Sequence, residues 1–235
     1  MKRFLSIIAI SSLPLVSQAD TYNVSDKFYV GLGAGMISPN NIDLKASQSV
    51  AVNGLTFSAD ATGELSFDNG YQITGLLGYR INEFLSFETE LGYTNFDYDK
   101  LTGSETYNIT SGGQTFSFTA GGTADVDGNI SAFSMIFGPT LDFDVYENLE
   151  LLLGGGIGFS SYNDEVKSIG GVNIGFDEDY TNFAAKFKTG ANYSFTEQTY
   201  VQATYGFNYV DSNIENLTSS DFTAHSFNAK VVFNF

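Results

Sequence analysis

Apolar and polar residues alternate along most of this chain, from about residue 27 to its end. In the last nine residues, the odd positions hold Phe, Ala, Val, Phe and Phe, while the even positions hold Asn, Lys, Val and Asn. A period of two is the pattern of a β-strand with two unlike faces, and helical spacing is hardly seen. The alternation therefore predicts an all-β protein.

Eight segments carry this pattern. With about 11 to 14 residues each, they are longer than the usual soluble strand and long enough to cross a bilayer at a tilt. We therefore expect eight membrane-crossing strands. Their cores lie at residues 28–38, 67–79, 85–93, 133–143, 149–159, 183–193, 201–209 and 227–235.

The charged residues of these segments share one face. Six of the segments carry no charge at their odd positions, and their charges lie on the opposite face. Because burying an unpaired charge is costly, four acids and four bases on one face predict an ion-pair network inside a barrel. The acids are Glu88, Glu90, Asp142 and Glu150, and the bases are Arg80, Lys186, Lys188 and Lys230.

This network has two readings. An eight-stranded barrel has an interior just wide enough to be filled by side chains, which favours a structural plug. The alternative is a gated ion path.

Connection lengths alternate along the chain. The connections at 80–83, 144–148 and 194–198 are short, whereas those at 39–66, 97–128, 162–178 and 211–221 are long. This asymmetry is typical of outer-membrane barrels. It predicts an eight-stranded antiparallel up-and-down transmembrane β-barrel with short periplasmic turns and long extracellular loops. The sheet must close between its first and last strands, and both termini are then periplasmic.

One residue conflicts with a closed barrel. Pro139 lies inside the fourth segment, where no free edge is available for a residue that lacks an N–H. We expect a bulge or an early strand end near Gly138. The glycine-rich run 154–158 has no phosphate-loop lysine and no following helix, so we interpret it as a strand that allows close packing inside the barrel.

The first nineteen residues have the features of a secretory signal peptide. Lys2 and Arg3 precede an apolar run at 4–16, and small residues end at Ala19. The pattern predicts cleavage after Ala19, which leaves one barrel domain at residues 20–235.

Composition excludes several classes of function. With 10 basic residues, 27 acidic residues and a formal charge of −17, the chain lacks the positive footprint of a nucleic-acid binder. It has no cysteine and one histidine, so thiolate chemistry and Cys-ligated metal sites are excluded. We expect no cofactor and no metal site.

Several short motifs resemble a known family. They are the opening segment 28–35, the Gly-Tyr pair at 78–79, the Glu-Leu-Gly-Tyr segment at 90–93 and the terminal segment 231–235. Together they resemble the opacity-protein and surface-antigen family of porin-like, eight-stranded outer-membrane barrels of Gram-negative bacteria. The resemblance implies outer-membrane lipid and lipopolysaccharide as surroundings. It also implies recognition by the barrel assembly machinery through Val231, Phe233 and Phe235.

The long loops are acidic. Their negative charge can serve solubility alone, or it can bind divalent cations that bridge to lipopolysaccharide, or another ligand. The residues that could make such contacts are Asp164, Glu165, Asp177, Glu178 and Asp179.

We therefore expect a non-enzymatic surface protein whose loops serve adhesion, another interaction or envelope integrity, with an unknown ligand. A low-conductance channel is the alternative. A lipid-modifying enzyme is weaker: the placement of His225 is similar to that of the catalytic histidine of lipid A deacylases, but the serine expected two residues later is Phe227.

Overall fold

The structure, a computed structural model, describes residues 27–53, 55–211, 218–219 and 221–235. The predicted signal peptide lies outside these residues. No helix among them is long and apolar enough to cross a membrane. Their regular elements are the strands β1 (Phe28–Pro39), β2 (Ile42–Val52), β3 (Leu55–Phe67), β4 (Gly70–Arg80), β5 (Leu85–Ser111), β6 (Gln114–Tyr146), β7 (Leu149–Ile169), β8 (Val172–Thr196), β9 (Thr199–Val210), β10 (Thr218–Ser219) and β11 (Phe222–Asn234).

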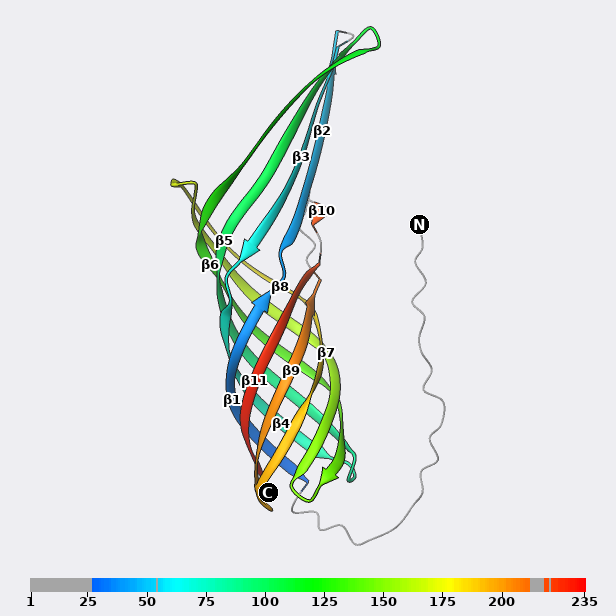
Figure 1. The fold of residues 1–235 in the computed structure, drawn as a ribbon, viewed down its shortest axis with the longest axis vertical. Helices are drawn as coiled ribbons and strands as arrows, with labels where there is room; N and C mark the ends of the chain where they lie inside the picture. Colours follow the sequence, from blue (N-terminus) through cyan, green and yellow to red (C-terminus); the bar gives the residue numbers. More distant parts are fainter. Residues whose placement is uncertain (1–26, 54, 212–217, 220) are drawn as a thin grey trace.

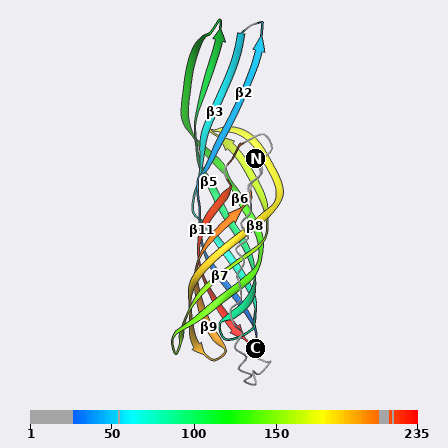
Figure 2. The same cartoon turned by 90° about the vertical axis from the view of Figure 1, so that its right-hand side faces the viewer.

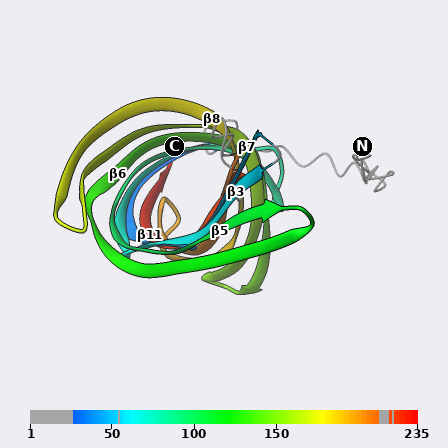
Figure 3. The ribbon, with the colours of Figure 1, turned by 90° about the horizontal axis from the view of Figure 1, so that it is seen from above.

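Eight of the strands close into a barrel. Each pairs antiparallel with two neighbours, in the ring order β1, β4, β5, β6, β7, β8, β9, β11 and back to β1. Figure 3, which looks down the barrel, shows this ring. The β1–β11 ladder, from Tyr29 opposite Asn234 to Pro39 opposite Ala224, closes it. The predicted eight-stranded antiparallel up-and-down barrel is confirmed.

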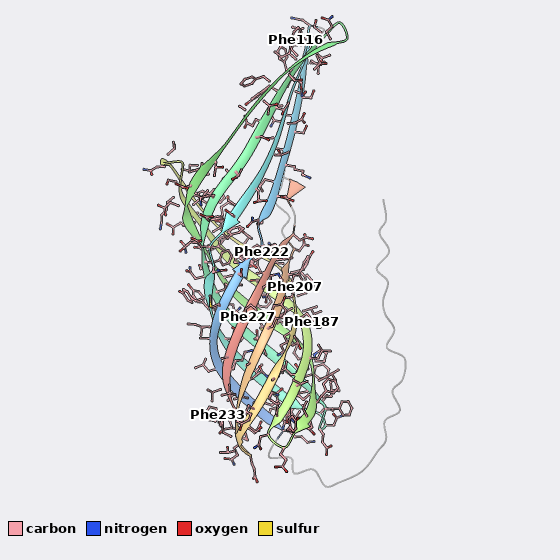
Figure 4. The ribbon with its side chains drawn as sticks, viewed as in Figure 1. Phe116, Phe187, Phe207, Phe222, Phe227 and Phe233 are labelled. Carbon is pink, nitrogen blue, oxygen red and sulfur yellow. The ribbon has the colours of Figure 1, made fainter. Side chains whose placement is uncertain are left out.

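The two faces of the wall differ as the alternation requires. Phe187 on β8 is 49% exposed on the outside, whereas its neighbour Lys186 is 8% exposed inside. Phe227 and Phe233 of β11 are likewise exposed on the outer surface (Figure 4). Apolar side chains therefore cover the outside of the barrel, and charged side chains lie within it.

The long connections are built largely of strands. Residues 39–66 form most of the β2–β3 hairpin, residues 97–128 continue β5 and β6, and residues 162–178 continue β7 and β8. Two-residue turns make these extensions possible, because a tight hairpin turn needs positive φ angles that glycine adopts readily. The turn glycines are Gly112 (φ 55°), Gly113 (φ 81°), Gly170 (φ 57°) and Gly171 (φ 79°).

Four of these extended segments form a sheet that projects from the barrel. β2 pairs with β3, β3 pairs with the upper part of β5, and that part pairs with the upper part of β6. We call this sheet, residues 42–65 and 101–124, the blade; Figures 1 and 2 show it extending along the long axis of the molecule. The end of the barrel from which it rises is called the blade end, and the opposite end, with the three short connections, the turn end.

A register shift between Asp97 and Lys100 determines which face of the blade continues the barrel interior. Phe96 below the shift and Tyr98 within it, both even-numbered, are buried inside the barrel. Above it, the odd-numbered Leu101 packs against the same apolar cluster. The alternation in β5 is thus offset by one residue at this point, and the inner side of the barrel wall continues as one face of the blade.

Pro139 neither ends β6 nor shifts its register. It lies opposite Phe87 of β5 in a continuous ladder. On the other side, the pairing with β7 skips Gly138 and Pro139 and resumes at Thr140 without a change of register. The expected bulge or early strand end was therefore wrong: the ladder is interrupted on one side instead.

Candidate functional site

Charged side chains from three strands meet inside the barrel. Lys186 and Lys188 of β8 form ion pairs with Glu90 and Glu88 of β5, respectively. Lys230 Nζ of β11 lies 3.0 Å from the second carboxylate oxygen of Glu90. None of these side chains is more than 8% exposed. We call these five residues the ion-pair layer; it joins walls that lie far apart around the ring.

Neutral groups complete the coordination of this layer. The Tyr29 hydroxyl donates to Glu88 Oε1 at 2.7 Å, and the Thr140 hydroxyl donates to Glu88 Oε2 at 2.7 Å. Lys230 Nζ donates to Gln202 Oε1 at 3.3 Å. A buried ion pair tolerates its loss of hydration only when its remaining donors and acceptors are also satisfied. These hydrogen bonds meet most of that requirement; Glu90 Oε2 accepts no hydrogen bond from the described residues and is held by its ion pair with Lys230 alone.

Glycines on neighbouring strands make room for the lysine stems. A Cβ added at Gly33 would lie 2.5 Å from Lys230 Cγ, and one added at Gly206 would lie 2.8 Å from Lys186 Cε. A Cβ at Gly154 would lie 3.0 Å from Lys188 Cε. The ion-pair layer therefore depends on three positions that carry no side chain.

The remaining predicted interior charges lie apart from this layer. The guanidinium carbon of Arg80 lies 5.7 Å from the ring centre of Tyr29, a cation–π contact. Asp142 and Glu150 both accept hydrogen bonds from the Asn192 amide, each at 3.2 Å. Five of the eight predicted charges thus meet directly, while Arg80 is held by an aromatic ring.

A second interior layer is apolar and lies between the ion-pair layer and the blade. Phe67 is packed at its centre, with ring centroids 5.6 Å from Phe96, 5.3 Å from Tyr98 and 6.1 Å from Phe222. We call this layer the apolar cap. Its buried members are Ile37, Phe96, Tyr98, Val126, Ile130, Ala132, Tyr162, Ala184, Val210, Phe222 and Ala224.

Sequence reasoning missed the apolar cap. Its members on β5 to β7 occupy even positions, on the face that we interpreted as polar from its charges nearer the turn end. The sequence did carry a signal for it, because large apolar side chains also occupy even positions at Phe96, Tyr98, Ile130 and Tyr162. Apolar residues on both faces of a strand indicate that neither face is in water.

Two small cavities adjoin these layers. One, of about 20 Å³, is lined by Glu88, Glu90, Lys186 and Lys188. The other, of about 40 Å³, lies between Lys186 and the cap residue Phe222. Each volume admits water but not a larger solute.

The predicted acidic contacts lie on the extension of β7 and β8. Asp164 faces Glu178, and Glu165 faces Asp177. The Asn163 amide donates to Asp177 at 3.0 Å and to Asp179 at 3.1 Å. Among the described residues, no group of three or more His, Cys, Asp or Glu side chains could hold a metal ion. Cation or ligand binding by these acids stays a prediction.

Asp164 has an unusual environment for an acid at this end of the barrel. The Tyr98 hydroxyl of the apolar cap donates to its Oδ1 at 2.5 Å. Burial, together with the nearby charges of Glu178 and Asp177, raises the pKa of Asp164, although the Tyr98 hydrogen bond opposes the rise. Burial and the charges of Asp164 and Glu178 also raise the pKa of Tyr180 to about 12.

His225 lies on the outer surface among aromatic rings. Its Nδ1 is 2.6 Å from the Tyr205 hydroxyl, and its ring stacks on Tyr205 at 5.8 Å and contacts Phe207 at 5.5 Å. The residue two positions later, Phe227, is 60% exposed on the same face. Aromatic residues of β9 and β11 lie beside this histidine and position 227 holds no nucleophile, while Ser38 of β1 lies opposite it across the closing ladder.

The terminal residues Val231, Phe233 and Phe235 are exposed, at 43%, 48% and 57%. Val231 and Phe233 lie on the outer face of β11, the strand that closes the barrel against β1. Their role as an assembly signal stays a prediction.

The two faces of the blade differ strongly. On one face, hydroxyl side chains form cross-strand pairs at 3.0 or 3.1 Å: Thr62 with Ser104, Thr102 with Thr123, Thr106 with Thr119, and Thr110 with Thr115. On the other face, successive cross-strand rows are Ile42–Leu65–Leu101–Ala124, Leu44–Gly63–Gly103–Gly122, Ala46–Ala61–Glu105–Ala120, Gln48–Ala59–Tyr107–Phe118 and Val50–Phe57–Ile109–Phe116. We call these the hydroxyl face and the apolar face.

Known proteins share this architecture. A family model described as "Outer membrane protein beta-barrel domain" matches residues 5–235. Neisserial surface protein A is 18% identical, with 88% of this chain and 97% of that chain covered and a TM-score of 0.50. No curated protein matches the chain.

Two other solved structures are more distant. Ail of Yersinia pestis, in complex with the heparin analogue sucrose octasulfate, is 11% identical, with coverage of 89% and 99% and a TM-score of 0.40. The outer membrane protease OmpT of Escherichia coli is 13% identical, with coverage of 93% and 100% and a TM-score of 0.43.

Proposed function

The chain belongs to the outer-membrane β-barrel family, and on that premise we propose that it is a non-enzymatic surface protein whose barrel anchors the blade outside the cell for binding. The barrel supplies a rigid anchor. The blade and the acidic β7–β8 extension supply the interacting surfaces.

The blade is the observation that carries this proposal. Its four strands continue beyond the barrel through regular ladders, and they end in a row formed by Val52, Leu55, Ser111 and Gln114. In open solution, a long sheet with one apolar face is a liability for aggregation. A binding role gives a physical reason to maintain such a sheet.

The orientation follows from the same asymmetry. Short turns face the periplasm in outer-membrane barrels, and long connections face outward. We place the turn end in the periplasm, with both ends of the barrel domain on that side. The outer wall, with residues such as Leu32 (69% exposed), then contacts lipid, and the blade end meets lipopolysaccharide.

The filled interior supports binding over conduction. A solute moving along the barrel would have to break the ion-pair layer and displace the apolar cap. Leaving one member of a buried ion pair without its partner costs about 3–5 kcal/mol. The channel alternative therefore requires rearrangement of two successive layers.

The surroundings of His225 support a non-enzymatic role. A hydrolase of the serine–histidine type needs a nucleophile within hydrogen-bond reach of the base. Ser38 of β1 lies opposite His225 across the closing ladder, but the hydroxyl at His225 Nδ1 is that of Tyr205, and its aromatic neighbours on the outer surface are Tyr205, Phe207 and Phe227. They suit a side chain placed at the membrane interface.

The test compares bacteria that display the full chain with bacteria that display a trimmed chain, in which residues 43–64 and 101–124 are replaced by short turns. Attachment of the bacteria to host-cell monolayers is measured. Heat-dependent gel migration confirms that the trimmed barrel is closed. We expect attachment to fall with trimming. Equal attachment, or stable single-channel currents from the purified full chain in planar bilayers, would contradict the proposal.

A further inference from the structure

Large apolar side chains gather at the far end of the blade. Phe116 is 72% exposed and Phe118 is 65% exposed, more than most apolar residues on the outside of the barrel. Both lie on the apolar face (Figure 4 labels Phe116). We call the following residues the apolar tip: Val50, Val52, Phe57, Tyr107, Ile109, Phe116 and Phe118.

Strand register brings these residues together. Val50 faces Phe57 across β2 and β3, Phe57 faces Ile109 across β3 and β5, and Ile109 faces Phe116 across β5 and β6. One row of four apolar side chains thus spans the whole width of the blade. Tyr107 and Phe118 face each other in the next row toward the barrel. The apolar tip is therefore a continuous surface.

This surface is uncharged on a strongly acidic protein. Residues 46–59 and 106–123 contain no Asp, Glu, Lys or Arg, although the chain as a whole carries a formal charge of −17. The nearest acids toward the barrel are Asp60 and Glu105. Charge is what lipid excludes most strongly, whereas exposed Phe, Val and Ile are favourable there. The composition of the tip matches an uncharged lipid surface.

The blade is amphipathic at this level. Ser117 and Thr119 alternate with Phe116 and Phe118 along β6. Both polar residues lie on the hydroxyl face, where Thr119 pairs with Thr106. Amphipathic helices at membrane interfaces direct their apolar face toward acyl chains and their polar face toward water, and the tip of the blade has the same division between its two faces.

We propose that the apolar tip docks into the outer leaflet of an uncharged lipid bilayer on a surface that faces the bacterium. This inference rests on the proposed function and names its partner as lipid. The occupant is a second membrane, distinct from the one that holds the barrel.

Backbone chemistry limits the depth of docking. Within the part of the chain that the structure describes, the outer edges of β2 from Ala46 to Val52 and of β6 from Gln114 to Ala124 have no strand partner. Unpaired N–H and C=O groups are not tolerated in hydrocarbon. The side chains of the tip therefore enter the leaflet, while the strand edges stay at the level of the headgroups.

The length of the blade keeps the tip away from its own membrane. β5 runs from Lys100 to Ser111 without a register shift, a span of roughly 36 Å at about 3.3 Å per residue. Bending back to the barrel's own bilayer would require four paired strands to break. A facing bilayer lies in the direction in which the blade already extends (Figures 1 and 2).

A protein partner fits the tip less well. Protein interfaces draw most of their affinity from Trp, Tyr and Arg anchors and from about ten hydrogen bonds. The apolar tip has no Arg and no Trp, and the hydroxyl of its one tyrosine, Tyr107, donates to Glu105.

The absence of tryptophan allows a direct test. Phe116→Trp and Ser117→Trp each introduce a single tryptophan, on the apolar face and the hydroxyl face, respectively, whose emission is excited selectively over that of the 14 tyrosines. Each variant is held in a lipid disc, and phosphatidylcholine vesicles with brominated acyl chains are added. Bromine quenches tryptophan that enters the acyl region. We expect blue-shifted, quenched emission from the Phe116→Trp variant, and unchanged emission from the Ser117→Trp variant.

A second variant measures affinity. Combined Phe116→Ser and Phe118→Ser changes lie at exposed positions far from the barrel, so heat-dependent gel migration should be unchanged. Burial of each phenylalanine is worth about tenfold or more in a partition constant, so vesicle binding should fall roughly a hundredfold.

Three outcomes overturn the inference. The first is no quenching of the Phe116→Trp variant by added brominated vesicles. The second is quenching only when the bromine is in the protein's own disc, which indicates its own membrane. The third is a blue shift that grows with protein concentration without vesicles, which indicates a second copy. If one of these occurs while the trimmed chain still loses attachment, the proposed function stands with a protein partner.

Discussion

Gly33 of β1 and Lys230 of β11 lie directly opposite each other in the ladder that closes the barrel. A Cβ on Gly33 would lie 2.5 Å from Lys230 Cγ and 2.2 Å from the backbone oxygen of Ala229. Lys230 is 1% exposed and reaches Glu90 across the interior. The β1–β11 ladder that closes the barrel and the buried ion pair of Lys230 therefore both require that position 33 carry no side chain.

Gly33→Ala should destabilise the barrel by about 1–3 kcal/mol, because the added methyl group overpacks the seam and displaces the Lys230 stem. Urea unfolding in detergent micelles measures the effect. Gly75→Ala is the control, since a Cβ there would meet only Leu91 Cβ, at 3.9 Å. Equal stability of the two variants would contradict the steric role of Gly33.

Glu90→Ala should destabilise the barrel by about 3–5 kcal/mol, because it leaves the buried ammonium groups of Lys186 and Lys230 without their carboxylate. The same unfolding measurement applies. Replacing both partners of the other pair, with Glu88→Gln and Lys188→Met together, should cost less than either change alone. A double variant whose cost equals the sum of the two single costs would show that the pair is not coupled.

Phe222→Ala should cost about 3–5 kcal/mol, because it opens a cavity in the apolar cap. Phe227→Ala, on the same strand but 60% exposed on the outer face, should cost less. Planar-bilayer recordings of the Phe222→Ala variant should stay silent, since the ion-pair layer still fills the barrel. Steady currents from this variant would mean that the cap alone closes the interior.

The stability of the blade end should depend on pH through Asp164. The pKa of its carboxyl is raised above the ordinary value of 3.8, chiefly by burial, so folding favours the neutral form. Its stabilising contribution is fully present below that ordinary value and is lost as the pH rises through the raised pKa.

Asp164→Asn cannot ionise and keeps an oxygen that accepts from Tyr98. Melting temperatures followed by gel migration should therefore fall less between about pH 4 and about pH 7 for this variant than for the unmodified chain. Asp60→Asn, on the blade, makes the same change of charge away from Asp164 and Tyr98 and serves as the control. A profile for Asp164→Asn that matches the unmodified chain would remove Asp164 as the cause.

The barrel was predictable because each of its strands has to separate lipid from a polar interior. The alternation was clear because the outer positions, such as Phe187 and Phe227, are uncharged, whereas inner positions hold charged residues such as Lys186 and Glu90. The particular pairs were not predictable, because which lysine meets which glutamate depends on strand tilt and register around the closed ring.

The blade was harder to predict from the sequence, although its turns carry a recognisable signal. Gly112-Gly113, between β5 and β6, is a two-residue hairpin turn of the preferred composition, and the Asn-Gly pair at 53–54 is the sequence signal of another. Their serine- and threonine-rich flanks favour an interpretation as loops, since such residues are common in both settings. The register shift between Asp97 and Lys100 also hides the continuity of the inner face, because it offsets the alternation by one residue.

The two blade hairpins end in the same cross-strand row, so their lengths should change together in evolution. Val52 and Leu55 finish one hairpin at the level where Ser111 and Gln114 finish the other. An insertion that lengthened only one of them would leave a two-stranded ribbon without neighbours, which is marginally stable in water. Among homologues, changes in the length of the blade should therefore arise as matched insertions or deletions at two distant places in the chain.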